Sequence, residues 1–203
     1  MRDRLQYLAS HTNRKGHPMI DLTAQNERWK TTPAIEIVRE ARDIFKTGLV
    51  AATHADSTSA LMLHLTANID IDIPVIHIEE DPKTTSFARE LAEKYELNIH
   101  CFPLSDSKPK TMEYAVRKLG GEGLVGLVHG ARGYQTSNRE KKQILELGRD
   151  GIYRIYPVLL WSRDMVANYF NQHRLLRRPD KVFDYRDDQE CGLLCYPHMG
   201  DSI

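Results

Sequence analysis

From Thr32 onwards, hydrophobic residues follow two alternating patterns. Short continuous apolar runs are typical of buried strands, whereas apolar residues three or four positions apart mark one face of a helix. The runs predict strands at 49–53, 73–78, 97–102, 123–129 and 152–158, and the spaced patterns predict helices at 33–45, 61–65, 82–95, 111–119 and 162–173. Strands that alternate with helices indicate an α/β fold, with a doubly wound, mostly parallel sheet and helices on both faces.

Two of these helices carry recognisable start signals. Thr32 is expected to be the N-cap of the first helix, with Pro33 at the first helical position, where the N–H that proline lacks would have no partner in any case. Ser162 is expected to cap the last helix in the same way. These signals fix where the first and last predicted helices begin.

The polarity of the chain changes at two places and divides it into three parts. Residues 1–31 are polar and weakly patterned, and we interpret them as an N-terminal arm or cap, with an oligomer contact as the alternative. Residues 32–174 form the α/β domain. Residues 175–203 are expected to be a flexible C-terminal tail, which holds Cys191 and Cys195.

Composition narrows the functional classes. Lysine and arginine total 28, and aspartate and glutamate total 28, so the formal net charge is 0. This balance excludes the broad basic surface of a general nucleic-acid-binding protein, but it leaves a local basic patch for nucleic acid open. No apolar run approaches the roughly 20 residues that cross a bilayer, so no membrane segment is expected. Three cysteines are too few for a disulfide scaffold, which favours the reducing cytoplasm.

Polar residues directly follow the first predicted strand. In an open parallel sheet, ligands bind beyond the carboxyl ends of the strands, often at helix N-termini whose free N–H groups attract anions. The turn after 49–53 contains Thr53, His54, Asp56, Ser57 and Thr58. Its hydroxyl groups and the following helix start suit a phosphate or sulfate group, although Asp56 or Ser57 acting only as a helix cap is the alternative.

Acidic residues follow the next predicted strand, at Glu79, Glu80 and Asp81. Acidic side chains at the start of a helix stabilise its dipole, and this structural role is one interpretation. In the functional interpretation, a carboxylate such as that of Glu79 binds a ribose hydroxyl, an adenine amine or a magnesium ion.

The loop after 123–129 is rich in hydrogen-bond donors, among them Arg132, Ser137 and Arg139. A guanidinium group matches phosphate and sulfate oxygens with two parallel N–H groups, so we favour an anion contact over a solvated connection. The crossover connections should bring this loop, the turn after 49–53 and the acidic turn to one rim of the sheet, where they would bind the acidic end of an adenylate.

The cysteines near the C-terminus belong to no core pattern. A thiolate near cationic groups is a nucleophile at neutral pH, so Cys191 is a candidate catalytic residue. Zinc bound by Cys191, Cys195 and His198 is the rival, but a closed zinc site needs four ligands and the sequence offers no evident fourth, so no metal site is expected. Cys101 lies in an apolar run and is expected to be an inert core residue.

Five segments carry a resemblance to a known family. They are Val50-Ala-Ala-Thr-His-Ala-Asp-Ser-Thr-Ser-Ala-Leu61, Ile73-Pro-Val-Ile-His-Ile-Glu-Glu80, Gly130-Ala-Arg-Gly-Tyr-Gln-Thr-Ser-Asn-Arg139, the segment 156–170, and Glu190-Cys-Gly-Leu193. In this order they resemble the phosphoadenosine-phosphosulfate reductase (sulfonucleotide reductase) family of the adenine-nucleotide alpha-hydrolase-like superfamily. The third segment looks like that family's substrate loop, and the last matches the start of its terminal Glu-Cys-Gly-Leu-His motif.

The resemblance implies an enzyme in which 32–174 is the nucleotide-binding domain and Cys191 attacks the sulfur of adenylyl sulfate or 3′-phosphoadenylyl sulfate. A thioredoxin- or glutaredoxin-type protein would then release sulfite. The Cys-Cys pair of the family's cluster-bearing branch is absent, so no iron–sulfur cluster is expected. Leu194 replaces the histidine of the terminal motif, and Thr53 and His54 replace the two glycines of a true ATP-pyrophosphatase loop.

Two other functions stay open. Asp56-Ser57-Thr58 resembles the loop of ATP pyrophosphatases, and with the basic residues Arg174, Arg177 and Arg178 it allows an adenylating enzyme of sulfur transfer or nucleic-acid modification, which would use Mg²⁺. The small size of the chain also allows a non-catalytic nucleotide-binding subunit of a larger assembly. Whatever the function, the chain is expected to act alone, as a homo-oligomer or within a larger assembly, and the sequence does not decide among these.

Overall fold

The computed structural model describes residues 20–56 and 58–178. Its helices are α2 (Leu22–Trp29), α3 (Ala34–Phe45), α4 (Ser59–Ala67), α5 (Pro82–Lys94), α6 (Lys108–Gly120), α7 (Ser137–Glu140) and α8 (Arg163–Gln172), with short 3₁₀ turns η1 (Lys46–Gly48) and η2 (Gly133–Gln135). Its strands are β1 (Leu49–Thr53), β2 (Val75–Glu79), β3 (Ile99–Pro103), β4 (Gly126–Val128), β5 (Leu145–Leu147) and β6 (Tyr153–Ile155). Cys191, Cys195 and the rest of the predicted tail beyond 178 lie outside the described residues.

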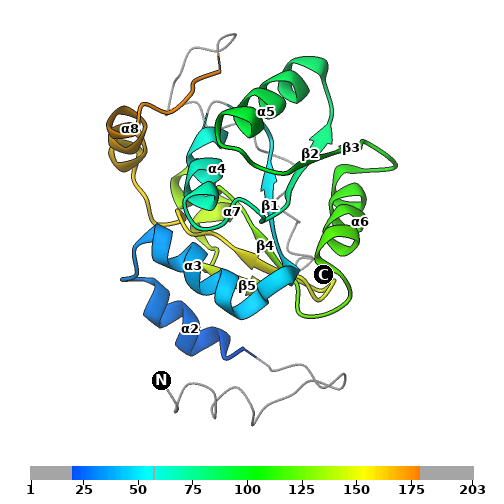
Figure 1. Ribbon diagram of the computed structural model, residues 1–203. Coiled ribbons are helices and arrows are strands. Elements are labelled where there is room, and N and C mark those ends of the chain that lie inside the picture. Colours follow the sequence, from blue (N-terminus) through cyan, green and yellow to red (C-terminus); the bar gives the residue numbers. More distant parts are fainter. Residues whose placement is uncertain (1–19, 57, 179–203) are drawn as a thin grey trace.

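The six strands form one sheet in the order β3-β2-β1-β4-β6-β5 (Figure 1). All neighbouring pairs are parallel except β5 and β6, which are antiparallel. In the register, Ala51 of β1 lies opposite Val75 of β2 on one side and Val128 of β4 on the other. The sheet is therefore mostly parallel, and the α/β fold predicted from the sequence is confirmed.

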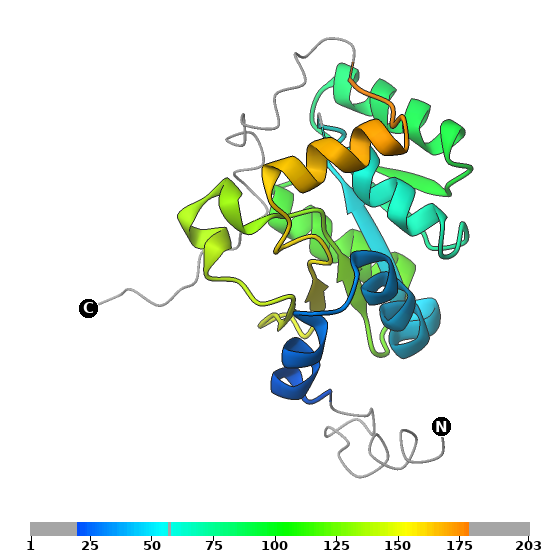
Figure 2. The ribbon, with the colours of Figure 1, turned by 90° about the vertical axis from the view of Figure 1, so that its left-hand side faces the viewer.

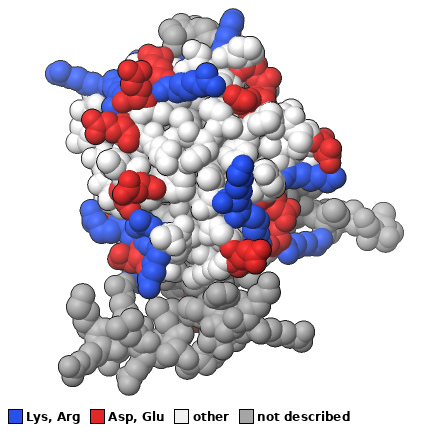
Figure 3. Space-filling model, turned by 45° about the vertical axis from the view of Figure 1, so that its right-hand side comes forward, with Lys and Arg blue, Asp and Glu red and all other residues white. Residues whose placement is uncertain are grey.

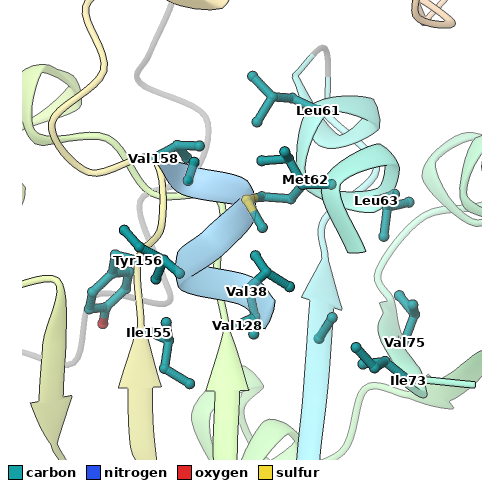
Figure 4. Close-up of a cluster of buried hydrophobic side chains, with 14 of the residues drawn as sticks. Val38, Leu61, Met62, Leu63, Ile73, Val75, Val128, Ile155, Tyr156 and Val158 are labelled. Carbon is teal, nitrogen blue, oxygen red and sulfur yellow. The ribbon is translucent and has the colours of Figure 1, made fainter. Parts of the chain in front are cut away.

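Side chains of β1 alternate between two cores on opposite faces of the sheet. Leu49 and Ala51 pack in a large core with residues of α3, α4, α5 and α8, whereas Val50 and Ala52 pack in a smaller core with residues of α6. Figure 4 shows part of the larger core, where Val38 of α3 and Leu61 to Leu63 of α4 lie among side chains from the strands. Each large buried side chain contributes about 1.5–3 kcal/mol, so these cores hold the helices against the sheet.

Helix starts follow the local chemistry of the sequence. The Asp81 side chain accepts a hydrogen bond from the backbone N–H of Lys83, 2.8 Å away, at the start of α5, and Ser162 caps α8 as predicted. The cap predicted for α3 was wrong by one residue, because Pro33 itself is the N-cap and its carbonyl accepts the first helical bond from Ile37. The Thr32 hydroxyl donates instead to the backbone carbonyl of Arg28.

Among the elements that were not predicted from the sequence are α2 and β5. Asn26 of α2 links them: its side-chain oxygen accepts from the Leu145 N–H at 2.8 Å, and its amide group donates to the Leu145 carbonyl at 2.9 Å. This side chain satisfies the outer backbone groups of Leu145, on the strand at the edge of the sheet. Strand β2 also begins later than its apolar run, because Pro74 has no N–H to donate to the sheet.

Two properties of the described residues bear on where the protein can act: the apolar character of its helices and the distribution of charge on its surface. Within the described residues, no helix has the length and apolar character needed to cross a membrane. On the face shown in Figure 3, acidic and basic side chains are interspersed, in keeping with the formal charge of 0. Helix α8 runs beside α4 (Figure 2), and the chain that follows it reaches Tyr95 at the end of α5.

Candidate functional site

Two loops that follow β1 and β4 form the walls of one cavity. Because these strands are neighbours and parallel, both loops leave the sheet at its carboxyl edge. The cavity is lined by Ala52, Thr53, His54, Asp56, Thr58, Ser59, Met62, His129, Gly130, Ala131, Arg132, Gln135, Arg139, Lys142 and Tyr156. Six of the candidate residues from the sequence, Thr53, His54, Asp56, Thr58, Arg132 and Arg139, therefore lie around one space.

The loop after β1 is a tight turn held by its own side chains. The Thr53 hydroxyl accepts from the N–H of Ala55 at 3.1 Å. One carboxylate oxygen of Asp56 accepts from the N–H of Thr58 at 3.0 Å and from the Ser59 hydroxyl at 2.9 Å. Thr58 is the N-cap of α4, so the interpretation of Asp56 as the helix cap was wrong; its carboxylate instead holds the turn before the helix, and this turn places the Thr53 and Thr58 side chains at the cavity.

The loop after β4 carries buried arginines in a fixed frame. Arg132 and Arg139 are only 3% and 4% exposed, although both are charged. Gln135 joins them: its side-chain oxygen accepts from the backbone N–H of Arg132 at 3.0 Å and from the guanidinium of Arg139. Arg132 also donates to the carbonyl of Gly130 at 2.8 Å. The guanidinium groups are therefore held in place before any ligand arrives.

Positive charge predominates around this cavity. Arg132, Arg139 and Lys142 line it, whereas Asp56 is the one acidic residue among its lining. Lys142 lies over the Tyr156 ring, 5.0 Å from its centre, and is paired with Glu146, whose carboxylate lies 3.0 Å from the lysine Nζ. An excess of cations beside hydroxyl groups is the environment that binds phosphate or sulfate.

Two histidines at the cavity are neutral at pH 7. Desolvation, followed by the nearby charge of Lys108, lowers the pKa of His54 to about 3. Burial and the nearby charge of Arg154 lower the pKa of His129 well below its ordinary value. His129 stacks on Tyr156 with ring centres 5.6 Å apart. Both imidazoles can therefore act as neutral hydrogen-bonding groups in a cationic site.

The structure also adds residues that the sequence did not single out. Lys142 reaches the cavity from the segment after α7, and Lys108, at the start of α6, is close enough to lower the pKa of His54. Lys108 is paired with Glu80. No motif marked these lysines, and only the packing of α6 and of the β4–β5 connection brings them to this edge.

The acidic turn after β2 does not join the cavity. Glu79 lines a separate hollow with Glu80, Asp81, Pro82, Thr85, Ser86 and Arg89. Asp81 caps α5, as its structural interpretation predicted, and the Glu79 carboxylate lies 3.5 Å from the guanidinium of Arg89. We expected three polar loops at one site. Two of them line the cavity, whereas the acidic turn after β2 lines the separate hollow.

The other predicted residues have different placements. Ser137 is exposed at the start of α7 and does not line the cavity. Ser57, Cys191 and Cys195 lie outside the described residues. Cys101 lies on β3 but is only half-buried, so its placement in the core was wrong. His77 is buried as a packing residue and contacts the Thr53 carbonyl and the Thr85 hydroxyl.

No cluster in the described part of the chain matches a metal site, since it contains no group of three or more His, Cys, Asp or Glu side chains that could hold an ion. The chemistry visible at the cavity is that of hydrogen-bond donors and fixed positive charge. Donors and cations in this arrangement suit an anionic ligand.

Comparison with protein families and curated proteins gives a consistent result. A family model described as the phosphoadenosine phosphosulfate reductase domain matches residues 48–179. The phosphoadenosine 5′-phosphosulfate reductase of Synechococcus sp. is 31% identical over 191 residues, which cover 80% of this chain and 81% of that protein. The enzyme of the same name from Synechocystis sp. is 28% identical, over 84% of this chain and 77% of that protein.

Solved structures match the fold. The crystal structure of phosphoadenylyl-sulfate reductase from Candida auris, a phosphate complex, has a TM-score of 0.65 at 17% identity, and covers 83% of this chain and 90% of that chain. The NH3-dependent NAD synthetase from Campylobacter jejuni, in complex with nitrate, has a TM-score of 0.50 at 10% identity, over 77% and 75% of the two chains. At these identities the likenesses show that the protein shares the fold of these structures.

Proposed function

Because the chain belongs to the phosphoadenosine phosphosulfate reductase family, and is accordingly an oxidoreductase of the sulfonucleotide-reductase type, we propose that it reduces the activated sulfate of 3′-phosphoadenylyl sulfate or adenylyl sulfate to sulfite. The adenine nucleotide binds with its acidic end in the cavity between the loops after β1 and β4. The cytoplasm is the expected compartment, since its thiols are kept reduced.

The observation that carries this proposal is the convergence of Arg132, Arg139 and Lys142 on a cavity that also presents the Thr53 and Thr58 side chains. Both sulfonucleotides carry negative charge on the phosphate–sulfate group that reacts, and buried guanidinium groups interact with such charge more strongly than exposed ones. The neutral imidazoles of His54 and His129 add hydrogen-bonding groups without adding charge.

The reacting group that we propose is the thiolate of Cys191, which lies outside the described residues. Its Sγ attacks the sulfate sulfur, so that an Sγ–S bond forms while the S–O bond to the phosphate breaks and its electron pair leaves with the nucleotide. Fixed cations around that phosphate stabilise the charge that develops on it. The product of this step is an S-sulfocysteine.

A dithiol of the thioredoxin or glutaredoxin type completes the cycle. One of its thiolates attacks Sγ of Cys191, and the Sγ–S bond breaks with its electron pair going to sulfite. The second thiol then breaks the mixed disulfide and returns Cys191 to its thiol form. The dithiol is oxidised to a disulfide as the sulfate is reduced, so electrons balance without a metal or flavin.

The experiment is sulfite release from each sulfonucleotide in the presence of thioredoxin or glutaredoxin. The wild-type protein should release sulfite, Cys191→Ser should not, and Cys101→Ser on β3 should behave as the wild type because Cys101 does not line the cavity. Turnover that is unchanged in Cys191→Ser would exclude the proposed nucleophile. Absence of sulfite with either nucleotide, together with pyrophosphate release from ATP, would favour the adenylating alternative instead.

A further inference from the structure

Arg178 is a buried charged residue that joins two distant parts of the chain. It is 7% exposed, and its Nη1 donates to the carbonyl of Ala55 at 3.3 Å, across 123 positions of sequence. It also lies near Asp81: the pKa of that exposed carboxyl group is lowered mainly by a hydrogen bond from Thr84, and to a smaller extent by the charge of Arg178. Arg178 therefore sits between the turns that follow β1 and β2.

Its partner Ala55 has an unfavourable backbone conformation. The φ angle of Ala55 is 51°, in the left-handed region that residues with a Cβ atom avoid, and the residue is fully buried. Both of its backbone polar groups are held, the N–H by the Thr53 hydroxyl and the carbonyl by Arg178. The reversal at Ala55 directs the following residues, Asp56 and Thr58, to the cavity wall. The shape of that wall thus depends on a strained residue.

The segment that delivers Arg178 is itself anchored after α8. Leu175 is buried in the larger core, and its N–H donates to the carbonyl of Phe170 at 3.1 Å. The N–H of Leu176 lies 3.4 Å from the Tyr95 hydroxyl. The neighbouring Arg177 is exposed and donates to the side chain of Asn171 at 2.8 Å. Arg177 carries the same charge one position away but is exposed to solvent and bound to Asn171, so it serves as the control for loss of charge alone.

We infer that Arg178 is a positioning residue, which holds the Ala55 carbonyl and thereby keeps the turn after β1 in the shape that binds the nucleotide. This inference rests on the proposed function. Because coupling between two sites is reciprocal, a nucleotide that binds at this turn should also stabilise the contact of the 175–178 segment. The 175–178 segment comes before Cys191, the proposed nucleophile, in the sequence. Binding of the nucleotide is thus coupled to the position of the chain segment that precedes Cys191.

The test compares Arg178→Gln, Arg178→Lys and Arg177→Gln. The probes are adenosine 3′,5′-bisphosphate and adenosine 5′-monophosphate, the nucleotides that sulfite formation would leave from 3′-phosphoadenylyl sulfate and from adenylyl sulfate, and the Kd of the one that the wild type binds more tightly is measured by titration calorimetry. Loss of one hydrogen bond from a charged donor should weaken binding about ten-fold in Arg178→Gln. Arg178→Lys should recover part of this loss, and Arg177→Gln should stay within about two-fold of the wild type. Circular dichroism establishes that each variant is folded.

Replacing Ala55 with glycine tests whether Arg178 acts by holding the Ala55 turn or in some other way. Glycine adopts the left-handed conformation without the penalty that a Cβ atom brings. Ala55→Gly in the Arg178→Gln background should therefore restore most of the lost affinity. If the double variant binds as poorly as Arg178→Gln, Arg178 does not act through the Ala55 turn and the inference is overturned.

Hydrogen exchange gives a reading that needs no ligand or turnover. Amides of residues 54–58 should exchange faster in Arg178→Gln than in the wild type, and Arg177→Gln should leave them unchanged. Equal exchange in Arg178→Gln and the wild type would overturn the inference. A wild-type protein that binds the nucleotide but releases no sulfite would instead overturn the proposed function, and the exchange comparison would still decide the role of Arg178.

Discussion

Lowering the pH from 7 to 5 should destabilise this protein through its two cavity histidines. The pKa of His54 is lowered to about 3 in the folded protein from 6.5, mainly by desolvation, and that of His129 is lowered well below 6.5 by burial. Below pH 6.5 the unfolded chain therefore binds protons that the folded chain does not. Stability is fully present above pH 6.5 and falls as the pH drops towards the folded pKa.

The magnitude follows from the size of this gap. A neutral His54 removes about 1.4 kcal/mol of stability per pH unit below 6.5, which integrates to about 2 kcal/mol between pH 7 and pH 5, less any screening, because His54 keeps some contact with solvent. The lowered pKa of His129 acts in the same direction and adds to this loss. This loss is a large fraction of the roughly 5–15 kcal/mol that stabilises a typical domain.

Urea unfolding at pH 7, 6 and 5 measures the effect directly. His54→Gln should have a stability that depends less on pH, by about 2 kcal/mol over this range, and His129→Gln should change the dependence in the same direction, because glutamine has no proton to gain. Carboxylates contribute equally to all three proteins and cancel in the comparison. A wild-type stability that does not fall with pH, or variants with the same dependence as the wild type, would refute the picture of two neutral imidazoles among cations.

Three further changes test other parts of the structure. Arg132→Gln should weaken binding of adenosine 3′,5′-bisphosphate about ten-fold or more by calorimetry, since hydrogen bonds to charged groups contribute about 1.5–3 kcal/mol; unchanged affinity would remove Arg132 from the site. Gly148→Ala should lower the free energy of unfolding, measured in urea, by about 1–3 kcal/mol, because the new Cβ would lie 1.8 Å from Nη1 of Arg154, which is paired with Asp150. A variant as stable as the wild type would show that this ion pair can move aside. Asn26→Ala should lower the free energy of unfolding by about 1–3 kcal/mol in the same assay, since the backbone N–H and carbonyl of Leu145 lose their partner. Unchanged stability would mean that water replaces the side-chain amide.

The sequence predicted the architecture well because apolar runs and helical spacing reflect burial directly. Leu49 to Thr53 is buried throughout, and β1 spans the predicted residues. The run at 73–78 predicted a longer strand than forms, since Ile73 is buried without pairing and Pro74 cannot donate. Burial sets the apolar pattern, whereas backbone donors set the ends of a strand.

The site was predicted in part. Thr53 and Arg132 could be expected to meet, because loops after parallel strands leave the sheet at the same edge. Lys108 and Lys142 could not, since each depends on how a helix or connection packs rather than on a local motif. Arg178 was noted only as one of several basic residues, and its contact with Ala55 spans 123 positions that no local pattern relates.

A crystal structure of the protein with adenosine 3′,5′-bisphosphate is the most direct test of where the nucleotide binds. A phosphate should lie in the cavity within hydrogen-bonding distance of the Arg132 guanidinium and of the Thr53 or Thr58 hydroxyl. A nucleotide bound in the hollow lined by Glu79, or anywhere that leaves Arg132 and these hydroxyls untouched, would contradict the assignment of this cavity as the substrate site.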